Sequence, residues 1–234
     1  MTQAPRAPLS PLRAGEQQLP KDLGGYLVRV LRLRSGDAFV LFDPDTATEA
    51  DAELVRDLPA IARVGEPRAV ARHGKRDVRL LQGLAKGDKP EQIVRAAVAL
   101  GARAVTFVRT ERSMPGAELR PERLRAVMLD AARQCGRGDL PLLGGLIDFA
   151  VALSGGGGLR LQLDPQGQQS LVEVLRAAAW DEAITLVIGP EGGFSAEEHR
   201  ALARAGFTPV RLAAYVLRTE LAAMAALAVV AAHE

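Results

Sequence analysis

The chain has 234 residues, of which 48% are hydrophobic and 25% are charged, and its formal net charge is +2 at pH 7. This composition is that of an ordinary globular protein and excludes a disordered or fibrous chain. The single cysteine excludes an internal disulfide, and three scattered histidines offer no metal-ligand spacing, so we expect no bound metal. The longest apolar run, residues 221–232, is too short to cross a bilayer, and no apolar leader opens the chain. We therefore expect a soluble, cytoplasmic protein.

The charge is distributed unevenly along the chain. Residues 1–34 carry six Lys or Arg against two Asp or Glu, and residues 71–137 carry fifteen against seven. The segments 35–70 and 138–234 are acidic. A polyanionic partner that touches the two basic blocks fits this pattern. Solvated charged faces explain it about equally well.

The first 71 residues predict a small β-rich domain. Residues 22–37 show a helical spacing of apolar side chains that ends at Gly36. The apolar period then changes to two over residues 37–43, and short alternating segments separated by turns continue to Val70. Short strands around tight turns indicate a barrel or sandwich.

Residues 72–234 alternate between strand and helix patterns. The predicted strands cover residues 77–85, 104–110, 159–164, 183–188 and 208–213. The predicted helices cover residues 90–101, 121–136, 168–179, 196–206 and a last segment that begins near Thr219. This alternation predicts an α/β domain with a mostly parallel sheet and helices on both faces.

The stretch "LVIGPEGGFSAEEHRAL" at residues 186–202 leads an apolar strand through a glycine-rich turn into a helix start. Ligands of open parallel sheets bind beyond the carboxyl ends of strands, where this turn lies. Gly192 and Gly193 permit a close backbone approach, and Ser195 with Glu198 forms a capping box that fixes the next helix. The turn matches neither a Walker loop nor a dinucleotide fingerprint. A tight connection without a ligand and a site for a nucleotide-like ligand explain it about equally well.

The second candidate stretch is "VLRTE" at residues 216–220, between the last strand and an apolar helix. Thr219 can cap this helix, and Glu220 suits the positive end of its dipole. Arg218 has no evident structural duty, which favours a functional one. The helix that follows is apolar almost all round, so we expect it to be buried in the core or against another subunit.

Together these two stretches resemble the SPOUT superfamily of methyltransferases, and specifically the bacterial 16S ribosomal RNA (uracil-N3)-methyltransferases. Further stretches agree in order along nearly the whole chain: "VLRLRSGD" (30–37), "LAKGDKPEQIVRAAVALGA" (84–102), "TERS" (110–113), Arg123–Leu124 and "AARQCGRGDLP" (131–141). The resemblance implies a PUA-like RNA-binding domain over residues 1–71 and a SPOUT methyltransferase domain over residues 72–234, with a trefoil knot at the cofactor site. It also implies S-adenosylmethionine as cofactor and 16S ribosomal RNA or the assembled small subunit as partner. A homodimer that buries the C-terminal helix, with the active site at its interface, is the implied assembly.

The resemblance also implies roles for individual residues. Cofactor contacts are implied for Leu163, Ile188, Gly189, Pro190, Glu191, Gly192, Gly193, Leu212, Leu217, Arg218 and Thr219. For catalysis we expect Arg218 to stabilise the uracil anion, with Glu220 or Thr219 organising it and Arg112 as a second candidate. Glu191 is a candidate base, although a solvated carboxylate is the more ordinary interpretation. The arginines expected at RNA phosphates, each equally explicable as surface charge, are Arg6, Arg29, Arg32, Arg123 and Arg137.

The chain departs from the family pattern at several positions. Residues that differ from the usual ones are Tyr26, Arg95, Ala99, Ala213, Tyr215 and Leu221, with Ala213 and Tyr215 replacing a glycine and an arginine. Three hypotheses therefore remain open. The chain methylates N3 of a uridine in 16S ribosomal RNA, or it is a knotted methyltransferase for another RNA or atom such as a ribose 2′-hydroxyl, or it is an RNA-binding module without catalysis.

Overall fold

The structure is a computed structural model that describes residues 4–71, 76–114, 116, 118–155 and 157–233. It divides into two compact units. Met1–Ala71 and Leu129–Leu140 form the first, and Arg72–Met128 and Pro141–Glu234 form the second. The predicted domain boundary after residue 71 adjoins residues 72–75, which lie outside the described residues.

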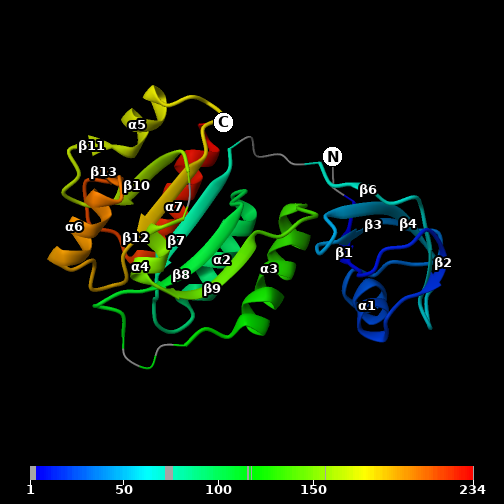
Figure 1. The fold of residues 1–234 in the computed structure, drawn as a ribbon. Coiled ribbons are helices and arrows are strands. Elements are labelled where there is room, and N and C mark those ends of the chain that lie inside the picture. Colours follow the sequence, from blue (N-terminus) through cyan, green and yellow to red (C-terminus); the bar gives the residue numbers. More distant parts are fainter. Residues whose placement is uncertain (1–3, 72–75, 115, 117, 156, 234) are drawn as a thin grey trace. The chain divides into compact units, whose positions relative to one another are not determined.

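The first unit is built on a β-sheet with strand order β1-β3-β4-β5-β2, in which β6 pairs with β4 (Figure 1). Its strands are β1 (Arg6–Pro8), β2 (Gly15–Gln18), β3 (Ala38–Asp43), β4 (Thr48–Arg56), β5 (Ile61–Val64) and β6 (Arg68–Ala69). All pairs are antiparallel except β1 with β3. On β4 the buried residues Ala50, Ala52 and Leu54 alternate with more exposed ones, as a half-buried strand requires. The predicted β-rich character of this region is confirmed.

The first predicted helix ends earlier than its apolar spacing suggests. Helical structure covers α1 (Lys21–Gly25) and one π-helical segment, η1 (Tyr26–Val30). Arg32 then adopts a left-handed φ of 60°, which a helix does not accommodate. The Leu33 N–H donates to the Leu27 carbonyl oxygen at 3.0 Å, and both side chains are buried. The apolar spacing continues beyond the helix because the turn also supplies a side chain to the core.

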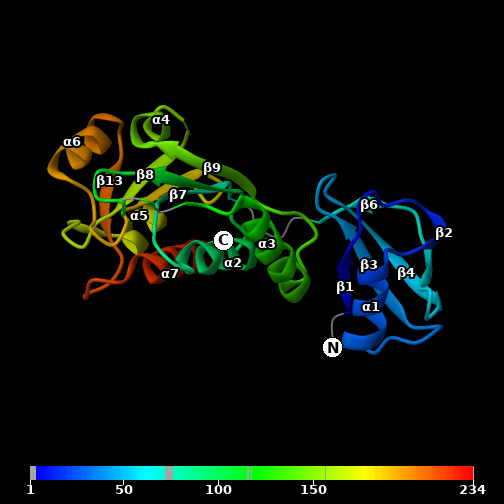
Figure 2. The same cartoon turned by 90° about the horizontal axis from the view of Figure 1, so that it is seen from below.

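The second unit holds a seven-stranded sheet in the order β11-β13-β10-β12-β7-β8-β9, with every neighbouring pair parallel. Its strands are β7 (Val78–Gly83), β8 (Ala104–Arg109), β9 (Leu142–Asp148), β10 (Leu159–Leu163), β11 (Gln169–Ser170), β12 (Ile184–Ile188) and β13 (Thr208–Arg211). The helices are α2 (Lys89–Ala99), α3 (Pro121–Cys135), which runs on into the first unit, α4 (Phe149–Leu153), α5 (Leu171–Ala177), α6 (Ala196–Arg204) and α7 (Thr219–Ala231). Figure 2 shows α4 and α6 on one face of the sheet and α2 and α7 on the other. The predicted α/β domain is confirmed, and its sheet is parallel throughout.

Strand β9 and helix α4 were not predicted, and the helix expected from residue 168 begins only at Leu171. Gly144 and Gly145 interrupt the apolar run of β9, which hides the strand pattern. A Cβ on Gly144 would lie 2.2 Å from Thr106 Oγ1 on the neighbouring strand β8. The glycine is therefore required by the close approach of the two strands.

The described helices include none that is long and apolar enough to span a bilayer. The apolar helix α7 has only 13 residues. The trefoil knot at the cofactor site stays a prediction.

Candidate active site

A pocket of about 730 Å³ lies in the second unit, beyond the carboxyl ends of strands β10, β12 and β7. A volume of this size is typical of small-molecule sites. The predicted cofactor residues on its wall are Leu163, Ile188, Gly189, Pro190, Glu191, Gly193, Leu212, Leu217, Arg218 and Thr219. Of that predicted set, Gly192 is absent from the wall. Three segments far apart in the sequence thus meet around one cavity.

A chain of buried hydrogen bonds joins these segments. Gln82, at the end of β7 and fully buried, donates from Nε2 to Thr219 Oγ1 at 2.8 Å. The Thr219 hydroxyl in turn donates to the Gly189 carbonyl oxygen at 2.6 Å. Arg218 occupies the N-cap position of α7, so the expectation that Thr219 caps this helix is wrong. The threonine instead fastens the start of α7 to the glycine-rich loop.

The glycine-rich loop also packs against the end of β7, backbone to backbone. A Cβ on Gly83 would lie 2.4 Å from the nitrogen of Pro190, closer than any side chain allows. Gly193 has a φ of +67°, and its N–H closes a turn on the Pro190 carbonyl oxygen at 2.9 Å. Sequence reasoning overlooked Gln82 and Gly83. In the sequence, a polar residue followed by glycine at the end of an apolar strand is the pattern that could have identified them.

The predicted capping box is confirmed and anchors the other end of the loop. The Glu198 N–H donates to Ser195 Oγ at 3.3 Å, and the Ser195 N–H donates to Glu198 Oε2 at 2.8 Å. Glu198 is buried and also accepts from the Glu111 N–H at 2.8 Å, after strand β8. The loop is therefore fixed at both of its ends.

The β7 side of the pocket wall is cationic and holds Glu191 in place. Lys89 Nζ lies 2.5 Å from Glu191 Oε1, and Lys86 lines the same region. Partial burial opposes ionisation of Glu191, but hydrogen bonds from Lys89 and from backbone N–H groups outweigh it, so the pKa of this carboxyl is lowered. A carboxylate with a lowered pKa is a poor acceptor of protons near neutral pH. This arrangement argues against Glu191 as the base.

The other predicted catalytic residues lie in different surroundings. Arg112 is on the pocket wall and donates from Nη1 to the Gly192 carbonyl oxygen at 3.0 Å. Glu220 is not on the wall, and its Oε2 lies 3.8 Å from Lys89 Nζ, too far for a hydrogen bond. Arg218 is exposed on the wall, and its guanidinium makes no hydrogen bond or ion pair with any described residue. It is a cationic donor open to an occupant of the pocket.

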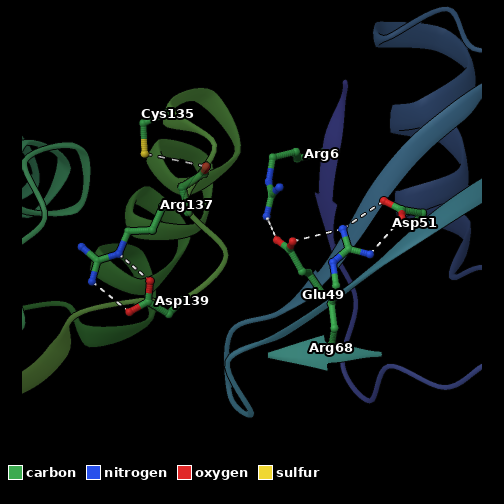
Figure 3. Close-up of polar contacts among 8 residues, drawn as sticks. Arg6, Glu49, Asp51, Arg68, Cys135, Arg137 and Asp139 are labelled. Carbon is green, nitrogen blue, oxygen red and sulfur yellow. Dashed lines mark hydrogen bonds and ion pairs between the residues drawn. The ribbon is translucent and has the colours of Figure 1, made fainter. Parts of the chain in front are cut away.

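The arginines predicted to contact RNA fall into three groups. Arg6 donates to Glu49 at 2.6 Å, and Arg137 donates to Asp139 at 2.8 and 3.1 Å, both with mostly buried side chains (Figure 3). Arg123 is exposed and pairs with Glu91 at 3.0 Å. Arg29 and Arg32 are exposed, and their guanidinium groups have no hydrogen-bond or ion-pair partner in the described part of the chain. Only this last pair is open to a phosphate.

Two families match the two parts of the chain. Residues 72–231 match the RNA methyltransferase domain, and residues 19–57 match the RNA methyltransferase PUA domain. The chain is 31% identical over 226 residues to the ribosomal RNA small subunit methyltransferase E of Mycobacterium tuberculosis. The aligned region covers 89% of this chain and 83% of the relative. The chain belongs to the ribosomal RNA small subunit methyltransferase E family. A Synechocystis member is 30% identical over 208 residues, covering 87% of this chain and 68% of its own.

Two similar solved structures contain the methyl donor. The ribosomal RNA small subunit methyltransferase E of Neisseria gonorrhoeae, bound to S-adenosylmethionine, has 28% identity and a TM-score of 0.84, covering 96% of this chain and 95% of that one. A Legionella pneumophila protein in complex with the same bound cofactor has 27% identity and a TM-score of 0.84, covering 99% and 98%. The resemblance drawn from the motifs is confirmed. So is the fold class, a β-rich PUA domain followed by a SPOUT methyltransferase domain.

Proposed function

We propose that this chain transfers a methyl group from S-adenosylmethionine to N3 of a specific uridine in 16S ribosomal RNA. The observation that carries the proposal is the pocket itself, where three separate segments converge and the Arg218 guanidinium has no partner among the described residues. Membership of the ribosomal RNA small subunit methyltransferase E family supports the reaction class, and the two relatives solved with S-adenosylmethionine support the cofactor.

The residues of the pocket fit S-adenosylmethionine. Apolar side chains suited to an adenine ring come from Leu163, Ile188, Leu212 and Leu217, one or two from each segment. A Cβ on Gly189 would approach Gly193 Cα to 3.2 Å, so the loop exposes its backbone where side chains would not fit. Backbone N–H and carbonyl groups can then recognise a flat nucleoside by shape. When bound, S-adenosylmethionine supplies an electrophilic methyl group.

Arg218 has the chemistry that the acceptor base requires. The N3–H of uracil lies between two carbonyl groups and is weakly acidic, so methylation requires that the ring lose this proton. The guanidinium of Arg218 is a cationic donor that can stabilise negative charge as it develops on a neighbouring carbonyl oxygen. Thr219, fixed by Gln82 and Gly189, holds the adjacent backbone in place. Arg112 on the same wall is the second candidate for this role.

The proposed assembly is a homodimer that covers α7 and the rim of the pocket. Tyr215 and Val216 line the pocket yet are 85% and 78% exposed, and Leu221 on α7 is 48% exposed. Contiguous exposed apolar side chains favour burial against a second surface. Chromatography with light scattering should give a dimer mass, and a monomer at micromolar concentration would exclude this arrangement.

The proposed RNA contacts of the first unit are Arg29 and Arg32, whose guanidinium groups are unpaired among the described residues. We place the enzyme in the cytoplasm, on 16S ribosomal RNA or the assembled small subunit.

The function is tested by nucleoside mass spectrometry of 16S ribosomal RNA from a strain that lacks this chain. The proposal expects one N3-methyluridine to disappear and to return with the wild-type chain but not with Arg218→Ala. Persistence of N3-methyluridine would overturn it, and loss of a 2′-O-methylated nucleotide would assign the enzyme to another atom.

A further inference from the structure

The β10 side of the pocket carries a polar cluster for which the proposed chemistry has no use. It comprises Gln162 at the end of β10, Asp164 just after it and His199 on α6. Asp164 and His199 line the pocket. Gln162 is 3% exposed, and its Nε2 lies 2.7 Å from His199 Nδ1 and 3.4 Å from Asp164 Oδ2.

The hydrogen bonds of this cluster select the tautomer of a neutral histidine ring. An ionised carboxylate accepts only, so the side of the Gln162 amide that faces Asp164 and His199 is its NH₂ group. His199 Nδ1 must then accept from Gln162, which places the proton of the neutral ring on Nε2. Among the described residues, Nε2 has no hydrogen-bond partner. His199 therefore offers one unused N–H donor at the pocket wall.

The two sides of the pocket suit different parts of the methyl donor. The β7 side carries Lys86 and Lys89, which suit an anionic group. The β10 side carries the Asp164 carboxylate, which repels an anion, together with neutral donors. Phe194 is nearby, with its ring centroid 5.9 Å from that of His199 in an edge-on arrangement, and adds an apolar wall. Neutral polar groups next to an aromatic wall match a nucleoside, whose ring nitrogens and hydroxyl oxygens accept hydrogen bonds.

We propose that His199 binds the nucleoside part of the methyl donor by donating from Nε2, and that Gln162 is a positioning residue that fixes the tautomer. This inference rests on the proposed function and adds to it a residue that recognises the cofactor by a hydrogen bond. It does not depend on how the RNA is bound.

Two amide substitutions of His199 separate donation from support of the fold. In His199→Gln the longer amide places an N–H near the position of Nε2, whereas in His199→Asn the shorter amide reaches only the position of Nδ1. Calorimetric titration with S-adenosylhomocysteine should give wild-type affinity for His199→Gln and about 3- to 10-fold weaker binding for His199→Asn, the range of one neutral hydrogen bond. Adenosine alone should show the same loss. Equal affinity in the two variants, or weaker binding only in His199→Gln, would overturn the proposal.

The role of Gln162 has a spectroscopic test. Nitrogen-15 shifts of the histidine rings report the tautomer, and the His199→Gln variant assigns the His199 signals. The wild-type ring should carry its proton on Nε2. In Gln162→Leu the ring should no longer prefer this tautomer, and the affinity for S-adenosylhomocysteine should fall about 3-fold. It should cause no further loss in the His199→Asn background. A ring protonated on Nδ1 in the wild-type chain would refute the assignment.

Failure of this inference is distinct from failure of the proposed function. If the wild-type chain binds S-adenosylhomocysteine and His199→Asn binds it equally well, only the role of His199 falls. If the wild-type chain does not bind it at all, the proposed function falls with it. As a matched control, Arg200→Ala changes the next residue of α6, which pairs with Glu197 away from the pocket, and should leave affinity unchanged.

Discussion

In the first unit Arg6 and Arg137 are mostly buried and each donates to a carboxylate, whereas in the second unit Arg218 stands exposed on the pocket wall with no described partner. All three residues are arginines, and from the sequence alone all three are candidate contacts of an RNA phosphate or of the substrate base. A guanidinium already paired with a carboxylate has its donors occupied and stabilises the fold. An unpaired one next to a cavity retains its donors for a ligand. The presence of a carboxylate partner, more than the residue type, separates the structural arginines from the one that we propose to act on the substrate.

The largest effect expected from this contrast is on turnover. Arg218→Ala should lower the rate of methyl transfer by about 100- to 1,000-fold, the cost of removing one donor to a developing negative charge. The affinity for S-adenosylhomocysteine should change little, because the cavity is held by other residues. Single-turnover transfer of labelled methyl to small subunits measures the first quantity, and calorimetry measures the second. An Arg218→Ala variant with undiminished turnover would remove this residue from the mechanism.

A second prediction concerns the link between the pocket segments. Thr219→Val keeps the shape but leaves the Gln82 amide and the Gly189 carbonyl oxygen without the shared hydroxyl. We expect a loss of about 1–3 kcal/mol in the free energy of unfolding, together with weaker cofactor binding. Thr219→Ser retains the hydroxyl and should behave almost as wild type. Urea denaturation of both variants provides the comparison, and equal stability of the two would show that the hydroxyl is not needed.

The paired arginines of the first unit should behave in the opposite way to Arg218. Among the described residues, Arg6→Ala leaves Glu49 with only its longer contact to Arg68, at 3.2 Å, so we expect about 1–2 kcal/mol of lost stability. Arg29→Ala, at an exposed and unpaired position, should stay within about 0.5 kcal/mol of wild type. In Arg29→Ala the affinity for RNA should fall less steeply with increasing salt concentration than in wild type. If Arg29→Ala destabilised the unit and left RNA binding intact, Arg29 would stabilise the fold and would not bind RNA, which is the opposite of what we expect.

The smallest predicted effect depends on pH. Because the pKa of Glu191 is lowered in the fold, its contribution to stability is present above the ordinary glutamate range of about 4.3 and is lost as the pH falls through the lowered value. Melting temperatures should therefore be lower for Glu191→Gln than for wild type at pH 7, and the gap should close in acid. Glu66→Gln, at an exposed position without a described partner, should show no gap at either pH.

Much of the fold follows from local patterns, and the exceptions have physical reasons. Periodicity and proline and glycine signals locate most strands and helices of the second unit, since each element buries one regular face. Strand β9 was not predicted because Gly144 interrupts its apolar pattern. This glycine is required by the close approach of a neighbouring strand, which is a tertiary requirement. The first helix is overextended because Leu33 reaches the core from a turn.

The site was predictable in its main segments but not in its connections. The glycine-rich turn and Arg218 stand out locally, and the family motifs place them together. The local pattern can mark Gln82 and Gly83 as candidates, but it cannot show their contacts, which are with residues over one hundred positions away. His199 lies one turn into the capped helix α6 and reads in the sequence as an ordinary surface residue.

We propose that residues 188–193 and 212–219 form one pocket for the methyl donor, with Arg218 turned to the substrate. A crystal structure with S-adenosylhomocysteine tests it most directly. We expect the ligand between these two segments, against the backbone of Gly189 and Gly193, with the Arg218 guanidinium free on its open side. Electron density for the ligand elsewhere on the chain, or the two segments separated without a cavity between them, would contradict the account.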